Sequence, residues 1–442
     1  MAFLYQAGLA CNSAWPIRVF EVDDQDALWC STQIQPLSLY RLTNQDFARL
    51  NIGGSPYGVG QSLGTLQLMQ DGVTDIPANE NWQGVKSMGG GIMLAWLASS
   101  ASGKFYLMRS HDRGASWGNA NNNNHAAVLN LGEPTGTGLH DGTLQFTDIQ
   151  ILGTRGISPV IIGGARVYLF GEYNVNAASG TTAAGGVCRI WRSDDLGITW
   201  SVLVEFNTTG GTAQVRHCHY VGQDPYSGWI YFGFGDSATS ALIAWNGTAA
   251  APPTGTFPHD FGNFPGWRGV GIGNFRRYAP AAVTNVDVFQ VTDLCFTKDW
   301  IYNPADNGDS SAVNRGIWRF RRDFTDMERV FDNSARAGHS NYWILPHSSG
   351  IIYTIEILEG TSTDGILYIH ASINNGDSWY EAAKFPFKAS GVGSVDCFLE
   401  RAMDKAIWVS TRDHNLWPAA NSNSYQLFPT ALRSPINTVS GG

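Results

Sequence analysis

Charged side chains are scarce in this chain of 442 residues, because Asp, Glu, Lys and Arg together make up only 15% of it. Acidic residues outnumber basic ones, the formal net charge is −9, and no segment gathers lysine and arginine into a basic stripe. A protein that binds nucleic acid needs such a stripe to displace counterions from the phosphates. We therefore expect no nucleic-acid partner.

Long apolar runs are absent as well. Each hydrophobic stretch is short and interrupted by Gly, Asn or Asp, whereas a helix that crosses a bilayer needs about 20 apolar residues in a row. We expect no membrane insertion. The N-terminal residues also lack the basic start and apolar core of a secretory signal. We expect an extracellular protein that has lost its leader, or one that reaches the outside on the surface of a virus or phage particle.

The six cysteines are scattered along the chain, at positions 11, 30, 188, 218, 295 and 397, and no two form a C-x-x-C pair. This spacing excludes a zinc knuckle and a thioredoxin-like redox motif. We expect buried free thiols. The alternative is a disulfide between Cys11 and Cys30, which are predicted to lie on neighbouring strands.

Glycine and aromatic residues, in contrast, are plentiful: there are 51 glycines, and 12% of the residues are Phe, Trp or Tyr. This composition favours short strands joined by tight turns over long helices. A chain of this length exceeds the roughly 250–300 residues at which a single hydrophobic core stops growing. The sequence therefore predicts an all-β architecture made of repeats.

Three copies of one pattern confirm that the chain contains an internal repeat. Residues 110–117 (SHDRGASW), 193–200 (SDDLGITW) and 372–379 (SINNGDSW) each follow an alternating strand. The Asp or Asn side chain accepts backbone N–H groups of the turn, Gly supplies a positive φ, and Trp packs over the hairpin. Each copy therefore predicts a β-hairpin in which these residues have a structural role.

Four weaker copies lie in the gaps, at residues 37–42, 241–247, 316–320 and 406–413. Together with the three clear copies they make seven hairpins, at the spacing expected for blades of four antiparallel strands. The sequence thus predicts a β-propeller, with seven blades favoured over six. We expect one domain, residues 1–442, whose ring is closed by pairing of the N- and C-terminal strands.

The Ser-x-Asp-x-Gly-x-x-Trp hairpins resemble the Asp-boxes (BNR repeats) of sialidases and other glycan-directed propellers. The resemblance implies that the partner is a polysaccharide or a cell-surface glycan. It also implies that the boxes lie away from the central site, so the functional residues have to be sought on other strands.

One strand gathers unusual side chains. In the run from Gln214 to Tyr220 (QVRHCHY), alternation places His217 and His219 on one face, and Arg216 and Tyr220 on the other. A D-P-Y-S-G turn follows at residues 224–228. Inner strands of propellers line the central tunnel, so two adjacent imidazoles at its mouth are candidates for acid–base chemistry.

The R-H-x-H run, the D-P-Y-x-G turn and the later G-D pair resemble ulvan-type polysaccharide lyases, over roughly residues 185–330. That resemblance implies that Arg277 neutralises the uronate carboxylate, that His217 and His219 act as acid/base or hold the substrate, and that Tyr278 is a candidate base. Arg216 and Tyr220 are then assigned to substrate binding. We expect His217, His219 and Arg277 to converge on one open pocket.

We expect no cofactor and no metal. The alternative is a metal ion at His217 and His219, since Gln214 completes a Q-x-x-H-x-H spacing seen in some lyase propellers. Strand alternation argues against that alternative, because Gln214 falls on the other face unless a bulge intervenes. Structural, hydrogen-bonded histidines are the third interpretation of the same pair.

A second group of aromatic and imidazole side chains contains His339, Trp343 and His347. His339 and Trp343 are assigned to substrate binding, because an exposed Trp can stack on sugar rings; packing between blades is the alternative. A sialidase is disfavoured, since an R-I-P-like strand is missing. A glycosidase needs two facing carboxylates, and none of the candidates pairs clearly: Asp141, Glu172, Asp224 and Asp236.

Two classes of function remain. The first is an enzyme, either a polysaccharide lyase or a glycoside hydrolase. The lyase would cleave an acidic polysaccharide by β-elimination. The second is a non-catalytic module that binds a glycan or receptor, or decorates a virus or phage particle and contacts its other proteins.

Overall fold

Nearly all regular structure is strand, as the composition predicts. The computed structural model describes residues 5–15, 17–32, 39–42, 67–70, 81–98, 104–115, 144–147, 149–150, 155–174, 187–208, 213–236, 239–283, 285–306, 314–336, 338–358, 365–386, 393–402, 405–413 and 423–433. The last two residues of the first repeat, Ser116 and Trp117, lie outside these ranges, as does Asp141.

Five sheets of four antiparallel strands follow one another along the chain. Unit 1 consists of β2 (Ile17–Val22), β3 (Leu28–Thr32), β4 (Leu39–Leu42) and β5 (Gln67–Gln70); unit 2 of β6 (Asn81–Gly89), β7 (Ile92–Ala98), β8 (Lys104–Ser110) and β9 (Leu144–Thr147); unit 3 of β11 (Ile157–Ile162), β12 (Ala165–Gly171), β14 (Val187–Ser193) and β15 (Ser201–Asn207); unit 4 of β16 (His217–Gln223), β17 (Ile230–Gly235), β18 (Ala241–Trp245) and β19 (Trp267–Val270); unit 5 of β20 (Cys295–Phe296), β21 (Ile301–Pro304), β22 (Ile317–Phe320) and β23 (Glu328–Phe331).

The C-terminal part forms one sheet of eight strands. One half, unit 6, consists of β24 (His339–Pro346), β25 (Ile352–Leu358), β26 (Ile366–Ser372) and β27 (Tyr380–Pro386); the other, unit 7, consists of β28 (Gly393–Glu400), β29 (Ile407–Asp413), β30 (Asn423–Arg433) and β1 (Tyr5–Trp15). A single residue pair, Leu358 with Gly393, joins the halves. The N-terminal strand β1 pairs along its length with β30.

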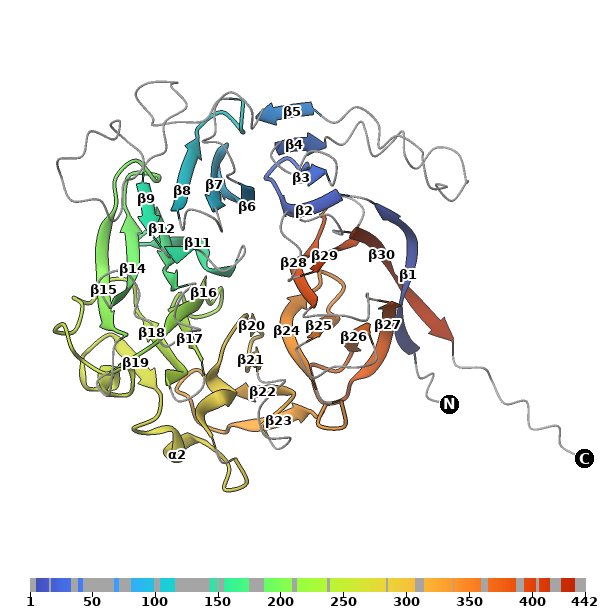
Figure 1. Cartoon of the computed structure of the whole chain (residues 1–442). Coiled ribbons are helices and arrows are strands. Elements are labelled where there is room, and N and C mark those ends of the chain that lie inside the picture. The colour runs from blue at the N-terminus through green and yellow to red at the C-terminus, as the bar shows by residue number, and fades with distance from the viewer. Residues whose placement is uncertain are drawn as a thin grey trace, which may run out of the picture.

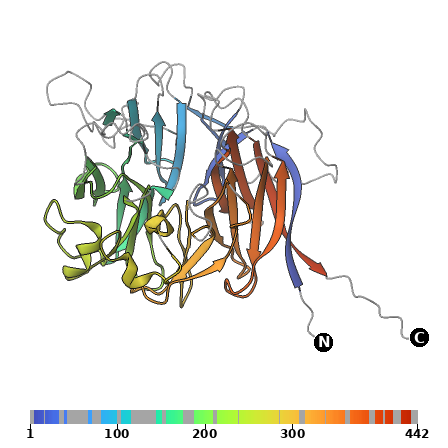
Figure 2. The same ribbon diagram turned by 60° about the horizontal axis from the view of Figure 1, so that its bottom comes forward.

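The sheets stand around a common axis, with β2, β16, β24 and β28 inside and β15 and β23 outside (Figure 1), and β1 and β30 leave the ring together (Figure 2). The predicted all-β propeller of mostly four-stranded antiparallel sheets is confirmed. Counted by separate sheets of four or more strands, the described residues form a six-bladed propeller, which was the alternative count. The seventh four-stranded unit of the favoured count shares its sheet with unit 6 through that one residue pair.

The few remaining elements are short. They are a two-stranded sheet of β10 (Ile149–Gln150) and β13 (Tyr173–Asn174), the 3-10 helices η5 (Pro258–Asn263) and η6 (Val286–Phe289), and the single-turn helix α2 (Phe275–Tyr278). None of the helices in the described ranges is long and apolar enough to cross a membrane.

The hydrophobic core lies between neighbouring sheets. Trp29 of unit 1 packs with Val85 and Met93 of unit 2, and Phe206 of unit 3 packs with Phe234 of unit 4. Because both faces of a sheet are covered in this way, strands such as β17 and β25 are buried at every residue. Five cysteines lie in these buried positions as free thiols: Cys30, Cys188, Cys218, Cys295 and Cys397. The alternative disulfide of Cys30 is therefore not formed; the side chain of Cys11 lies outside the described residues.

The three clear repeats form one type of turn after the third strand of units 2, 3 and 6. In each, the serine hydroxyl accepts the N–H of the glycine four residues later at 2.6–2.8 Å. The same hydroxyl donates to the Asp or Asn two residues later at 2.8–3.0 Å. The glycine and the residue before it both have positive φ, for example 63° at Leu196 and 86° at Gly197. The turn is thus made by hydrogen bonds within five residues.

Two of these turns are held by side chains of the preceding unit. Arg109 on β8 donates from Nε to the carbonyl of Leu196 at 2.7 Å. Likewise, Arg319 on β22 donates to the carbonyl of Asn375 at 3.4 Å, and the hydroxyl of Tyr302 donates to the same carbonyl. The turns therefore connect neighbouring units.

A substitution at Asp195 tests the structural role of the turn. Its Oδ1 accepts the N–H groups of Ile198 and Thr199 at 3.1 and 2.8 Å. Asn374 accepts the N–H of Ser378 in the same way, at 3.0 Å. We expect Asp195→Ala to lower the free energy of unfolding by about 1–2 kcal/mol, and Asp195→Asn to change it by less than about 0.5 kcal/mol. Equal losses in both variants, measured by denaturant unfolding, would contradict this role.

Candidate functional site

Two imidazoles project side by side from β16, the inner strand of unit 4. The ring centroids of His217 and His219 lie 4.7 Å apart, and the ring planes are tilted by 31°. The pairing of β16 with β17 shifts between Cys218 and Tyr220, so His219 is the extra residue of a β-bulge. Bulges change the direction in which a side chain points. With the bulge at His219, both imidazoles lie on the side of the strand that faces Asp236.

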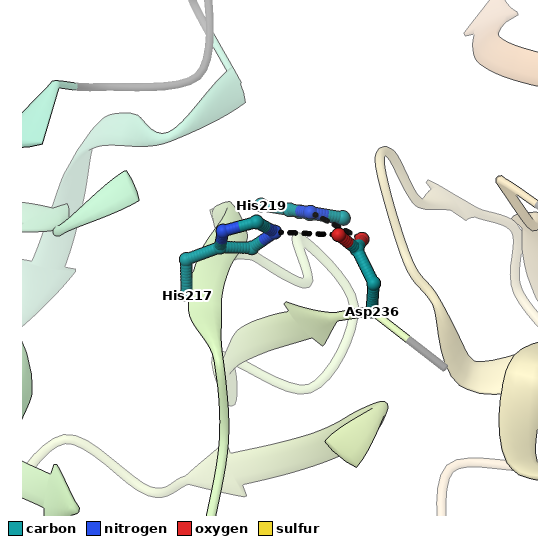
Figure 3. Close-up of side chains that lie close together, drawn as sticks. All are labelled: His217, His219 and Asp236. Carbon is teal, nitrogen blue, oxygen red and sulfur yellow. Dashed lines mark ion pairs between the residues drawn. The ribbon is translucent and has the colours of Figure 1, made fainter. Parts of the chain in front are cut away.

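A carboxylate lies between the two rings. Asp236 directly follows β17, and its Oδ2 lies 3.3 Å from Nε2 of His217 while its Oδ1 lies 3.4 Å from Nε2 of His219. Figure 3 shows the three side chains pointing toward one another. Arg216 also contacts this carboxylate, with its Nη1 at 2.7 Å from Oδ2. The aspartate thus contacts two side chains of β16 and the arginine that directly precedes this strand.

Neighbouring units complete the group. Tyr173 lies on β13, which comes between β12 and β14 in the chain, and it stacks on His217 with centroids 4.1 Å apart and planes 20° apart. Gln290 follows η6, before unit 5, and its Nε2 donates to Oδ1 of Asp236 at 2.9 Å. We call this set the His217–Asp236 cluster; its members are Tyr173, Arg216, His217, His219, Asp236 and Gln290.

Only part of the cluster reaches solvent. The side chains of His217 and His219 are each 2% exposed, whereas those of Arg216 and Asp236 are 28% and 22% exposed. Burial, and then the proximity of His217, lower the pKa of His219 to about 3. Burial alone would raise the pKa of Asp236, but His217, His219 and Arg216 hold it well below its ordinary range. At neutral pH the cluster therefore presents a carboxylate and a neutral His219.

A second carboxyl group, that of Glu172, lies next to the cluster in the chain. Glu172 precedes Tyr173 and is 1% exposed; its carboxylate accepts Nε1 of Trp191 at 2.8 Å and the N–H of Arg189 at 2.9 Å. Burial raises its pKa to about 7, although these two partners oppose the rise. Its side chain is directed to β14, so it does not face Asp236 as a second catalytic carboxylate of a glycosidase.

The expected convergence with Arg277 is not found. Arg277 and Tyr278 belong to α2, which lies at the outer edge of the ring, while β16 lies inside (Figure 1). The guanidinium of Arg277 lies over the ring of Tyr278, at 5.4 Å, and that ring contacts Phe324 edge-on. The expectation of an open pocket is corrected as well, because both imidazoles are almost fully buried.

Two further residues of the same segment point away from the cluster. Tyr220, beyond the bulge, is 6% exposed and packs in the core between units 4 and 5, and burial raises its pKa. Gln214 accepts the N–H of Asn207 at 2.7 Å and donates to the carbonyl of Thr256. Gln214 therefore does not join the histidines, and Asp236 occupies the position beside them.

His339 and Trp343 lie in unit 6, apart from the cluster. His339 belongs to a buried group around Glu356, whose carboxylate lies 3.4 Å from His339, 2.6 Å from His370 and 2.9 Å from Arg336. Burial opposes these contacts, but the two histidines lower the pKa of Glu356 to about 2. Trp343 is 3% exposed, so it has no surface on which a sugar could stack.

The other residues considered from sequence have structural partners. Asp224 accepts Nη2 of Arg322 at 3.1 Å and the N–H of Tyr226 at 3.0 Å, which anchors the turn into β17. His347 contacts the carbonyl of Lys405 at 3.0 Å. Sequence reasoning identified both histidines and named Asp236 only as one of several carboxylates. It missed Tyr173 and Gln290, for which no local pattern gives a signal.

Comparison with known proteins assigns the chain to no family. No family model matches the chain, and no curated protein matches its sequence. Solved structures resemble it at low identity. An ancestral GH74 enzyme has 12% identity and a TM-score of 0.42; the alignment covers 92% of this chain and 55% of that one, so this chain spans about half of that protein.

For two other solved structures, the alignment covers a larger share of the compared chain. The GH93 α-L-arabinofuranosidase of Fusarium graminearum, in complex with arabinobiose, has 10% identity and a TM-score of 0.37, with 80% of this chain and 95% of that one covered. An oligogalacturonate lyase in complex with manganese has 9% identity and a TM-score of 0.34, with 97% of each covered. These likenesses are distant, because none of the three structures exceeds 12% identity or a TM-score of 0.42.

Proposed function

We propose that this propeller binds an acidic polysaccharide at the His217–Asp236 cluster and cleaves it by β-elimination. One observation carries the proposal: the partly exposed guanidinium of Arg216 lies against an aspartate that also contacts two imidazoles. A guanidinium matches the geometry of a carboxylate and binds it through two parallel hydrogen bonds. A uronate carboxylate is therefore the group that this arrangement is suited to recognise.

The reaction needs a charge partner and two proton transfers. The C5–H bond of the uronate breaks and its proton passes to a base, a double bond forms between C4 and C5, and the C4–oxygen bond breaks while that oxygen gains a proton. Arg216 stabilises the negative charge that develops on the carboxylate side. Tyr173, which is stacked on His217, is the group that takes the proton from C5 and returns a proton to the leaving oxygen.

The resemblance to Asp-box propellers and ulvan-type lyases supports this proposal through the R-H-x-H run and the later G-D pair. In the proposal, Arg216 takes the role that the resemblance gave to Arg277, because α2 lies at the outer edge of the ring. We expect the protein to contact the glycan outside the cell or on the surface of a virus or phage particle.

A second candidate function is glycan or receptor binding without cleavage, as in a module that decorates a virus or phage particle. The burial of both imidazoles favours it, since a substrate would reach Arg216, Asp236 and Tyr173 before either histidine. The two candidates share the same binding surface and differ in whether a bond is broken.

A panel of uronate polysaccharides separates the two candidates. We expect ultraviolet absorbance of an unsaturated uronate to appear with at least one of them, and Arg216→Met to lower kcat/KM about 100-fold or more. Arg192→Met is the matched control, because Arg192 lies on β14, has a similar exposure of 26% and pairs with Asp194, the residue directly after that strand. Binding of an acidic glycan without any absorbance change would establish the second candidate, and neither binding nor cleavage would refute both.

A further inference from the structure

We infer that His217, His219 and Asp236 form a binding site for one divalent transition-metal ion. Among the described residues, this is the group in which three His, Cys, Asp or Glu side chains bring their ligand atoms within 4.8 Å of one another. Imidazole nitrogen together with carboxylate oxygen suits Zn²⁺, Co²⁺, Mn²⁺ and related ions, whereas Mg²⁺ and Ca²⁺ favour oxygen ligands alone. The inference rests on the geometry of these donors and not on the glycan proposal.

The donor spacing fits a shared ion. The two Nε2 atoms lie 3.3 and 3.4 Å from the nearest oxygens of Asp236. Donors that each lie about 2.1 Å from one metal ion are separated by about 3.0–3.4 Å when they subtend an angle between octahedral and tetrahedral. Figure 3 shows that both ring edges face the carboxylate, so an ion enters between them with small side-chain movements.

The surroundings hold the donors in place. Gln290 donates to Oδ1 of Asp236 at 2.9 Å, and Tyr173 stacks on His217. Such outer contacts orient metal ligands and affect affinity about 10–100-fold. Within the part of the chain that the structure describes, Arg216 is the Arg or Lys side chain that contacts Asp236, and its partial exposure allows the guanidinium to turn toward solvent when an ion binds. Three protein ligands also leave coordination positions open, which is typical of catalytic metal sites.

The other His–carboxylate group lacks this arrangement. In unit 6, Nη1 of Arg336 lies 2.9 Å from Oε1 of Glu356 and 3.0 Å from Nε2 of His370. The guanidinium thus occupies the space that an ion would need between those donors. Arg216, in contrast, donates from Nη1 to Oδ2 of Asp236 at 2.7 Å, while the other oxygen of that carboxylate, Oδ1, faces Nε2 of His219 at 3.4 Å.

Metal titration of tag-free protein, first stripped with a chelator, tests the inference. We expect Zn²⁺ to bind at one ion per chain with micromolar or tighter affinity by calorimetry, and Co²⁺ to give visible absorption bands. Asp236→Asn and His217→Gln keep the side-chain shapes and should each weaken binding at least about 10-fold. Arg216→Gln should bind as tightly as the unchanged protein or more tightly, because a neighbouring positive charge is removed.

His111→Ala is the matched control, because His111 is exposed in the turn after β8 and its loss should leave the affinity unchanged. The absence of saturable binding would overturn the inference, as would Asp236→Asn and His217→Gln variants that are folded by circular dichroism and bind like the unchanged protein. The titration contains no glycan. Metal binding without any glycan activity would refute the proposed function alone, and glycan cleavage without metal binding would refute this inference alone.

Discussion

Replacing Arg155 by methionine is expected to lower the free energy of unfolding by about 3–5 kcal/mol at pH 8. Arg155 precedes β11 in unit 3, and its Nη2 lies 3.1 Å from Oδ2 of Asp293, just before unit 5, and 3.2 Å from the carbonyl of Phe398 in unit 7. Its guanidinium also lies over Trp343 of unit 6, at 5.3 Å. One side chain therefore connects opposite parts of the ring.

The loss should depend on pH. Burial raises the pKa of Asp293 from its ordinary 3.8 to about 6, although Arg155 opposes the rise. A raised carboxyl pKa stabilises the folded state below about pH 4, and this stabilisation is lost as the pH rises through about 6. Without Arg155 the pKa of Asp293 in the folded protein is higher still, so the stability of the variant continues to fall at pH values above 6. The difference between the two proteins should be smallest near pH 4 and largest at pH 8.

Denaturant unfolding at a series of pH values measures this difference. Asp293→Asn in the Arg155→Met background should recover part of the stability, because the amide removes the unpaired charge and keeps an acceptor for the N–H of Leu294 or Ile344. A loss below about 1 kcal/mol at pH 8, or a loss that is the same at all pH values, would contradict a role for this ion pair.

The second large effect is expected at Gly235, the last residue of β17. A Cβ placed there would lie 2.2 Å from Cε1 and 2.7 Å from Nε2 of His219. The imidazole is buried beside His217 and Tyr173, so it has little room to move. Overpacking of this kind costs about 1–3 kcal/mol. We expect Gly235→Ala to destabilise the fold by that amount and to weaken the proposed metal binding by more than about 10-fold.

A double-mutant cycle tells this clash apart from a general effect of alanine on the strand. Removing the imidazole with His219→Ala leaves space for the new methyl group. Gly235→Ala should then cost less than about 0.5 kcal/mol in the His219→Ala background. An equal cost in both backgrounds, measured by denaturant unfolding, would show that the contact with His219 is not the cause.

The repeat pattern was largely predictable because it depends on local chemistry. The clear boxes follow the third strand of units 2, 3 and 6, and three of the four weaker copies coincide with β4, β18 and β22, the third strands of units 1, 4 and 5. The fourth, residues 406–413, coincides with β29, the second strand of unit 7. Alternation alone does not distinguish a second strand from a third, and it does not reveal that two units share one sheet.

The candidate site was predictable only in part. His217 and His219 lie two residues apart on one strand, so their common face follows from alternation alone. Arg277 lies within the segment that resembles ulvan-type lyases, yet it belongs to α2, which lies at the outer edge of the ring. Gln214 belongs to the same segment but bonds to Asn207 and Thr256, while Asp236, directly after the following strand, contacts the imidazoles.

Local sequence patterns were sufficient to predict the all-β class, the type of turn and the paired imidazoles, because each follows from contacts within a few residues. Tertiary structure alone decided that Tyr173, Asp236 and Gln290 meet around those imidazoles, and that Arg155 reaches Asp293. These residues belong to different units, and they become neighbours only when successive sheets pack face to face and the ring closes.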